Sequence, residues 1–207
     1  MMSATSLMND NITTTPPSLK PEQKKTFREE ALETFRFVLI ALAIVVPVRM
    51  FVAQPFFVSG ASMDPTFADH QYLIVDEISY RFTEPARGEV VIFKYPQNPS
   101  QYFIKRIIGL PGETVLITGA GQVTIKSKDA KITTTLNEPY VAFPKSDNIE
   151  RTLGANEYFV MGDNRAGSFD SRLWGPLERD LIVGKALVRL FPFSTAELLP
   201  GQFKQTQ

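Results

Sequence analysis

The chain has 207 residues, enough for one substantial domain with appendages. Its 22 basic and 22 acidic residues balance, so it lacks the basic excess that a nucleic-acid-binding face requires. It contains no cysteine and a single histidine, His70, which excludes disulfides, thiolate metal sites and a cysteine nucleophile and leaves few imidazoles for a metal. We therefore expect no nucleic-acid partner, no metal and no other cofactor.

The first segment, residues 1–24, is polar and rich in Ser, Thr and Pro. A segment of this composition buries too little apolar surface to offset the entropy of folding. It predicts a disordered tail.

A helix is predicted over residues 25–53. The stretch "KTFREEALETFR" favours helix strongly, and the next 17 positions, 37–53, are almost entirely apolar apart from Arg49. A membrane-spanning helix needs roughly 17–25 apolar residues. Basic residues gather before the apolar run, so the positive-inside rule predicts a cytoplasmic N-terminus and an exported remainder. A cleaved signal peptide is the alternative, although the 36 residues before the run are long for one.

A mainly β domain is predicted over residues 54–199. Short runs rich in Val, Ile, Phe and Tyr alternate with Gly, Pro, Asn and Asp, which is typical of antiparallel strands. These runs are "QYLIVDEISY", "GEVVIFKYP", "QYFIKRIIGL", "ETVLITGAGQVTIKS", "NEYFVMGDN" and "LIVGKALVRLFP". The part from about 119 to 154 is more polar and predicts a less regular insertion, and residues 200–207 form a C-terminal tail.

The stretch "VSGASMDPTF", residues 58–67, contains a candidate nucleophile, Ser62. A serine hydroxyl attacks a carbonyl only when a nearby base takes its proton. Gly60 and Ala61 before it leave room for a substrate backbone, and Asp64-Pro65 after it supplies a turn. A serine in such a turn is also common in purely structural loops.

Two residues are candidate bases for Ser62. His70 lies eight residues away, but it also fits a solvated loop histidine. Lys105, in "YFIKRIIGLPGE", shares a strand face with Phe103 and Ile107, where an ammonium is poorly solvated and its pKa falls. The alternative is an amphipathic strand from which Lys105 extends into solvent.

A third stretch, "MGDNRAGSFDSRLWG" over residues 161–175, combines acidic, basic and hydroxyl side chains after a predicted strand. Its Asp and Arg residues are expected to form ion pairs that hold a loop, and Ser168 to position a lysine amine. We interpret the stretch as the wall of an active site. Its Asp and Arg residues are Asp163, Arg165, Asp170 and Arg172.

The sequence resembles the bacterial type I signal peptidases, membrane-bound serine proteases that remove signal peptides from exported proteins. The resemblance rests on four blocks in order, "QPFFVSGASMDPT", "RGEVVIFKYP", "YFIKRIIGLPGE" and "MGDNRAGSFDSRLWG", with an apolar helix upstream. It implies an antiparallel β-sheet catalytic domain of the signal-peptidase type with one N-terminal transmembrane helix. Lysine in "FIKR", where eukaryotic-type relatives carry histidine, points to the bacterial type.

The resemblance also implies roles for single residues. Ser62 is the expected nucleophile and Lys105 its general base. Ser168 is expected to orient the lysine, and Asp170 and Arg172 to stabilise the catalytic core. The position of Gly60 is a serine in some members, where its hydroxyl adds to the oxyanion hole; here that donor is missing.

For the substrate, the resemblance implies shallow apolar pockets that accept small side chains one and three residues before the cleaved bond. The expected pocket residues are Phe56, Val58, Met63 and Ile104. The implied partners are the signal peptides of secreted preproteins, membrane lipid and, by proximity, the protein-export channel. The implied location is the cytoplasmic membrane, crossed once, with the catalytic domain outside.

Two other functions remain as alternatives. One is a Ser/Lys protease of the self-cleaving repressor type, which carries an N-terminal DNA-binding domain in place of an apolar helix. The other is a membrane-anchored binding or assembly protein without catalysis, since a fold does not establish an activity.

Overall fold

The computed structural model describes residues 27–51, 53–119 and 121–203. The chain divides into two compact units within its long helix, after Leu42. The predicted tail and the last four residues lie outside the described residues.

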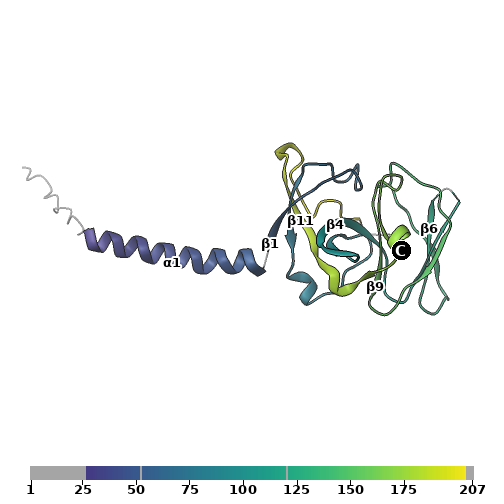
Figure 1. Cartoon of the computed structure of the whole chain (residues 1–207), viewed down its shortest axis with the longest axis horizontal. Helices are drawn as coiled ribbons and strands as arrows, with labels where there is room; N and C mark the ends of the chain where they lie inside the picture. The colour runs from purple at the N-terminus through teal and green to yellow at the C-terminus, as the bar shows by residue number, and fades with distance from the viewer. Residues whose placement is uncertain (1–26, 52, 120, 204–207) are drawn as a thin grey trace, which may run out of the picture. The chain divides into compact units, whose positions relative to one another are not determined.

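The helix α1, Phe27–Phe51, covers most of the stretch predicted as helical (Figure 1). Many of its large apolar side chains are exposed, including Phe37, Leu39 and Ile40. Across the described parts of the chain, no helix has both the length and the continuous apolar sequence needed to cross a membrane. The transmembrane part of the expected fold is thus not confirmed.

The strands in the described residues after α1 form two antiparallel sheets. The larger sheet follows the order β1-β2-β11-β3-β4-β9-β10, with β12 beside β11, and the smaller one the order β7-β6-β5-β8. The strands of the larger sheet are β1 Ala53–Phe57, β2 Tyr72–Asp76, β3 Val90–Tyr95, β4 Asn98–Gly109, β9 Glu157–Met161, β10 Leu177–Glu178, β11 Ile182–Phe191 and β12 Glu197–Leu198. Those of the smaller are β5 Thr114–Thr118, β6 Gln122–Lys126, β7 Thr133–Thr135 and β8 Ile149–Thr152.

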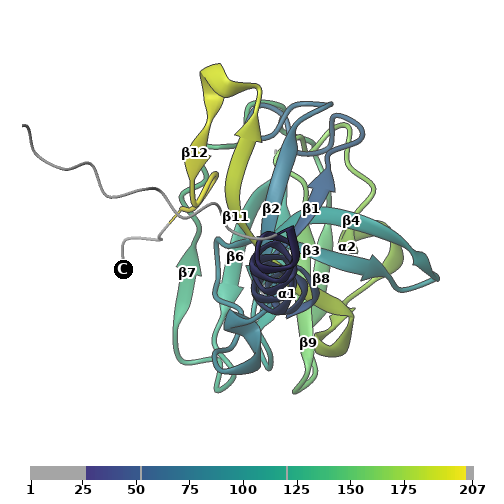
Figure 2. The ribbon, with the colours of Figure 1, turned by 90° about the vertical axis from the view of Figure 1, so that its left-hand side faces the viewer.

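The two sheets lie next to each other in the domain. Figure 1 shows β6 at one end and β1 and β11 at the other, with β4 and β9 between them. In Figure 2, β12, β11, β2 and β1 run side by side, as their pairing requires. The short helices are α2 Ser171–Trp174 and the 3-10 turns η1 Ser79–Arg81, η2 Arg179–Leu181 and η3 Phe193–Thr195.

The predicted mainly β architecture is confirmed, and each of the six predicted runs contains a strand. Much of the stretch 119–154, predicted as a less regular insertion, lies in the smaller sheet, whose strands run from β5 at Thr114 to β8 at Thr152. β1 was not predicted because Pro55 interrupts the pattern; β1 lies at the end of the sheet, where a missing N–H is tolerated.

The apolar core has separate parts, and one of them lies next to the candidate nucleophile. Val58, Met63 and Phe67 from the loop after β1 are buried against Leu73 of β2 and Ile92 of β3. Burying these side chains, at about 25 cal/mol per Å² of apolar surface, fixes the path of the loop that carries Ser62. A second cluster fills the smaller sheet, and a third lies between β3, β4 and β9.

Candidate active site

Ser62 lies in a loop that is held from both sides by hydrogen bonds. Val58 N–H donates to Gln71 O at 2.9 Å, which ties the start of the loop to β2. Asn164 holds the other side: its backbone N–H donates to Ser62 O at 3.1 Å and its Nδ2 donates to Ala61 O at 3.0 Å. The serine is therefore presented on a fixed backbone, as an attacking group requires.

Lys105 and Ser62 meet directly. Lys105 Nζ donates to Ser62 Oγ at 2.8 Å and to the carbonyl of Ile104 at 2.9 Å. The lysine is 4% exposed, and its nitrogen lies 5.4 Å from the centre of the Phe103 ring. Residues 43 positions apart thus lie within hydrogen-bond reach of each other, as a nucleophile and its base must.

Burial makes the amine a usable base. Removal from water lowers the pKa of Lys105 from its ordinary 10.5 to about 8, against the opposing negative charges of Asp170 and Asp163. A base with a pKa near the working pH is unprotonated often enough to act and still basic enough to take a proton.

The pair opens into an apolar cleft of about 290 Å³. Its lining includes Phe56, Val58 and Ile104, three of the four expected pocket residues. The fourth, Met63, does not line the cleft: it is 1% exposed and packs in the core beneath the loop. The reason is the turn after Ser62, in which Phe67 N–H donates to Met63 O and both side chains point inward.

The Asp and Arg residues of 161–175 form ion pairs, as expected. The Asp170–Arg172 pair lies within the stretch, whereas Asp163 and Arg165 pair with residues elsewhere in the chain. Asp170 accepts from Arg172 Nε at 2.8 Å and also from Gly162 N–H at 3.0 Å. Burial alone would raise the pKa of Asp170, but the Arg172 guanidinium outweighs it and holds the pKa below its usual value. Asp163 pairs with Arg106, the strand neighbour of Lys105, through Nε at 2.8 Å.

The signal peptidase family, described as "Signal peptidase, peptidase S26", matches this chain over residues 31–191. The chain belongs to this family. It is 36% identical over 187 residues to "Signal peptidase I" of Leptolyngbya laminosa, which covers 86% of this chain and 88% of that protein. It is 32% identical to "Signal peptidase I" of Bacillus amyloliquefaciens, over 85% and 97% of the two chains.

Among solved structures, a signal peptidase I from Enterococcus faecalis V583 is 30% identical and covers 50% of this chain and 97% of its own, with a TM-score of 0.41. The expected resemblance to the bacterial type I signal peptidases is confirmed by the family match and these relatives. The chain is accordingly a serine endopeptidase of the signal peptidase family.

Ser168 does not bind the lysine as expected. Its side chain is buried, and its Oγ forms no hydrogen bond of ordinary geometry with any described residue. It lies close enough to Asp170 to help lower the pKa of that carboxyl. Lys105 is oriented by the carbonyl of Ile104, a backbone group that no sequence pattern indicates.

Gly60 is placed at the rim of the cleft but does not act as an oxyanion donor in this arrangement. It has a φ of +94°, and its N–H donates to Asp69 Oδ1 at 2.9 Å. Asp69 also pairs with His70, whose Nδ1 lies 2.9 Å from Asp69 Oδ2. The histidine is largely exposed and pairs with this carboxylate, while the amine of Lys105 holds Ser62.

Gly162 and Asn164 are site residues that the sequence did not single out. A Cβ at Gly162 would overlap both the Ser62 carbonyl oxygen and Ser168 Oγ, so only glycine lets the two segments close. Asn164 uses three polar groups, because its Oδ1 also accepts from Gly167 N–H at 2.9 Å. Both lie in the quoted block "MGDN", but only the fold shows what they contact.

Proposed function

We propose that this peptidase removes N-terminal signal peptides from exported preproteins by a Ser/Lys mechanism. The observation that carries the proposal is the 2.8 Å hydrogen bond between Lys105 Nζ and Ser62 Oγ inside an apolar cleft. The family and the names of its relatives supply the substrate class.

In the proposed reaction, the unprotonated Lys105 amine takes the proton of Ser62 Oγ as the oxygen attacks the scissile carbonyl carbon. The tetrahedral intermediate collapses when the lysine ammonium returns this proton to the leaving amine. Lys105 then activates a water that hydrolyses the acyl-enzyme and frees Ser62. The Ser62 N–H is the proposed oxyanion donor, since Gly60 N–H already serves Asp69.

We propose that the enzyme prefers substrates with small side chains just before the cleaved bond. Phe56, Val58 and Ile104 line the cleft beside Ser62, and their side chains limit its depth. An apolar pocket discriminates by size at about 1–3 kcal/mol per methylene. Alanine one and three residues before the cleaved bond is the expected optimum.

Anchoring in the cytoplasmic membrane is part of the proposal, with the catalytic domain outside, near the export channel. It is supported by the apolar run of residues 37–53 and by exposed apolar side chains along α1. Basic residues before the run favour a cytoplasmic N-terminus. Anchoring would restrict the search for a signal peptide to the plane of the bilayer.

The test uses the full-length protein in detergent with a precursor that carries an Ala-x-Ala cleavage region. Wild type is expected to cut after the second alanine, and Ser62→Ala and Lys105→Ala to lose at least about 10³-fold in kcat, because each removes half of the pair. Circular dichroism confirms that each variant is folded. Full activity in Lys105→Ala together with loss in His70→Ala would contradict the assignment of the base.

The pH profile provides a second test. Since Lys105 must be unprotonated to act, kcat/KM is expected to rise with pH and to level off above about 8, the pKa to which burial lowers it. A kcat/KM that does not change between pH 7 and pH 9 would contradict Lys105 as the base.

A further inference from the structure

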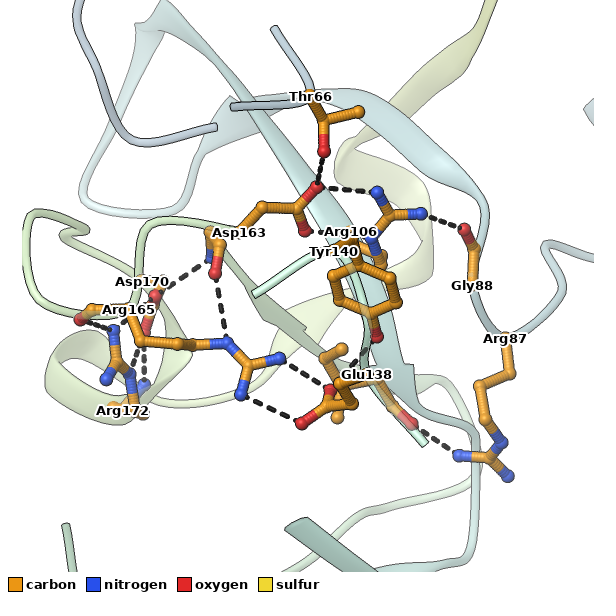
Figure 3. A network of polar contacts seen from close by, with 12 residues as sticks. Thr66, Arg87, Gly88, Arg106, Glu138, Tyr140, Asp163, Arg165, Asp170 and Arg172 are labelled. Carbon is orange, nitrogen blue, oxygen red and sulfur yellow. Dashed lines mark hydrogen bonds and ion pairs between the residues drawn. The ribbon is translucent and has the colours of Figure 1, made fainter. Parts of the chain in front are cut away.

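The turn Glu138-Pro139-Tyr140 lies between β7 and β8 of the smaller sheet, but its side chains reach the larger one (Figure 3). Glu138 accepts from both terminal nitrogens of Arg165, Nη1 at 3.0 Å and Nη2 at 2.5 Å. Arg165 is 3% exposed and the Glu138 side chain 10%, so this is a buried, bidentate pair. Such pairs fix orientation as well as distance.

Arg165, held by Glu138, also binds residues 162–164, which contact the Ser62 backbone. Its Nε donates to Gly162 O at 3.1 Å, and that bond is buried. Gly162 packs so closely against Ser62 O that a side chain there would overlap it. The peptide 162–164 also donates to Ser62 O through Asn164 N–H at 3.1 Å. Glu138 thus acts on Ser62 through one arginine and one backbone segment.

Tyr140 reaches the same segment by a second route. Its ring lies 3.9 Å from Arg106 Cζ, a close cation–π contact, and its hydroxyl donates to Glu138 Oε1 at 3.0 Å. Arg106 holds both oxygens of Asp163, at 2.8 Å and 2.5 Å. Asp163 in turn accepts from Thr66 Oγ at 2.5 Å, four residues after Ser62.

Both routes therefore end on residues 162–164: Arg165 donates to Gly162 O, and Arg106 donates to the Asp163 carboxylate (Figure 3). We propose that Glu138 and Tyr140 are positioning residues of the peptidase, which hold Arg165 and Arg106 so that residues 162–164 fix Ser62 against Lys105. This inference rests on the proposed Ser/Lys mechanism. It gives the smaller sheet a part in catalysis, although neither residue lines the cleft.

Because Glu138 and Tyr140 lie outside the cleft lining, their loss acts on kcat and leaves KM nearly unchanged. A displacement of about 1 Å in a reacting group is enough to reduce a rate about 10²-fold. A residue that only stabilised the fold would instead lower the folded fraction, and the folded molecules would keep their kcat.

The experiment compares full-length variants on the Ala-x-Ala precursor, with kcat expressed per folded molecule. Glu138→Gln keeps the shape of the side chain but leaves Arg165 buried without a carboxylate, which is destabilising. The double variant Glu138→Met/Arg165→Met removes both charges and is expected to recover the stability. Glu150→Gln is the matched control, since Glu150 forms an exposed pair with Lys126 in the smaller sheet.

We expect the double variant to unfold at the same denaturant concentration as wild type within error, and yet to have a kcat about 10²-fold lower with KM within about twofold. Tyr140→Leu is expected to lower kcat about tenfold, while Tyr140→Phe, which keeps the ring over Arg106, recovers most of it. Glu150→Gln is expected to match wild type.

Recovery of both stability and kcat in the double variant would overturn the proposal, because the pair would then serve the fold alone. An equal loss in Glu150→Gln would overturn it too. Absence of cleavage by folded wild type, or full activity in Ser62→Ala, is a different result: it refutes the proposed mechanism itself and with it the positioning role.

Discussion

The two sheets of the catalytic domain differ in where they place charge. The larger sheet surrounds buried charged side chains: Lys105, Arg106, Asp163, Arg165 and Asp170. The smaller sheet packs an apolar cluster, and its strands form an exposed ion pair, Lys126–Glu150, while the buried Glu138–Arg165 pair lies in the turn between β7 and β8. Burying a charge is costly unless it is paired. Most of the buried charges of the domain therefore lie around Ser62 and Lys105, and the strands of the smaller sheet carry their charged side chains at the surface.

The largest expected difference between the two sheets concerns substitutions at closely packed glycines. Gly162→Ala places a methyl group against Ser62 O and Ser168 Oγ, so the nucleophile segment must move, and we expect kcat to fall by about 10² or more. The matched change is Gly154→Ala next to β8, where the atoms nearest to the added carbon belong to the flexible side chain of Glu157, at 3.3 Å. Steady-state cleavage of the precursor measures both, and equal losses would show that the two regions are equally constrained.

Ion pairs give the next largest difference. Asp163→Asn leaves Arg106 buried beside a neutral partner, and we expect it to lower the free energy of unfolding by about 3–5 kcal/mol. Glu150→Gln breaks an exposed pair and is expected to cost at most about 1 kcal/mol. Urea denaturation of both variants makes the comparison.

Asp163→Asn has a second expected effect, on the pH profile. The Asp163 charge raises the pKa of Lys105, so its removal lets burial lower that pKa further. The acid limb of kcat/KM should move to lower pH. An unchanged limb in folded protein would mean that Asp163 acts on the fold only.

Lys105→Met tests whether the buried amine of Lys105 lowers the stability of the folded protein. Below pH 8 the amine is charged in both the folded and the unfolded chain, so the folded state bears the full penalty. Between about 8 and 10.5 the folded state loses this proton first, and wild-type stability rises; above 10.5 the penalty is gone. We expect the inactive variant to be up to about 3 kcal/mol more stable than wild type at pH 7, with the difference vanishing near pH 11. A pH-independent difference would contradict this account.

The smallest effect belongs to the core of the smaller sheet. Ile125→Val removes one buried methyl group and is expected to cost about 0.5–1.5 kcal/mol, with kcat unchanged. Denaturation and cleavage assays on the same preparation separate the two quantities. A fall in kcat per folded molecule would show that chemistry depends on packing throughout this sheet.

Sequence patterns predicted the features that depend on local order. Alternation and turn residues predicted most strands, and the family blocks predicted the Ser62–Lys105 pair, whose hydrogen bond the structure contains. β1 was missed because a proline conceals an edge strand. Met63 was misplaced because its neighbour Ser62 suggested the cleft, while the turn directs Met63 into the core.

Apart from the Ser62–Lys105 pair, contacts between distant segments were not predicted. Asp163 pairs with Arg106, 57 positions earlier, in preference to Arg165, two positions later. Arg165 instead pairs with Glu138, which the sequence indicated only as a turn. The alignment of β4 with β9 brings Arg106 close to Asp163, and the path of the chain between β7 and β8 brings Glu138 to Arg165. No spacing along the chain encodes either arrangement.

The turn between β6 and β7 has a practical consequence. Residues 128–131 are exposed there, and the turn is closed by its own bonds, including Ser127 N–H to Ile132 O at 2.8 Å. Since loop length adds little to the entropy of closure, a short tag inserted after Asp129 should leave the strands paired. A fluorophore at that point would report on the enzyme during preprotein turnover without touching the cleft, which makes this hairpin a natural attachment site for single-molecule work.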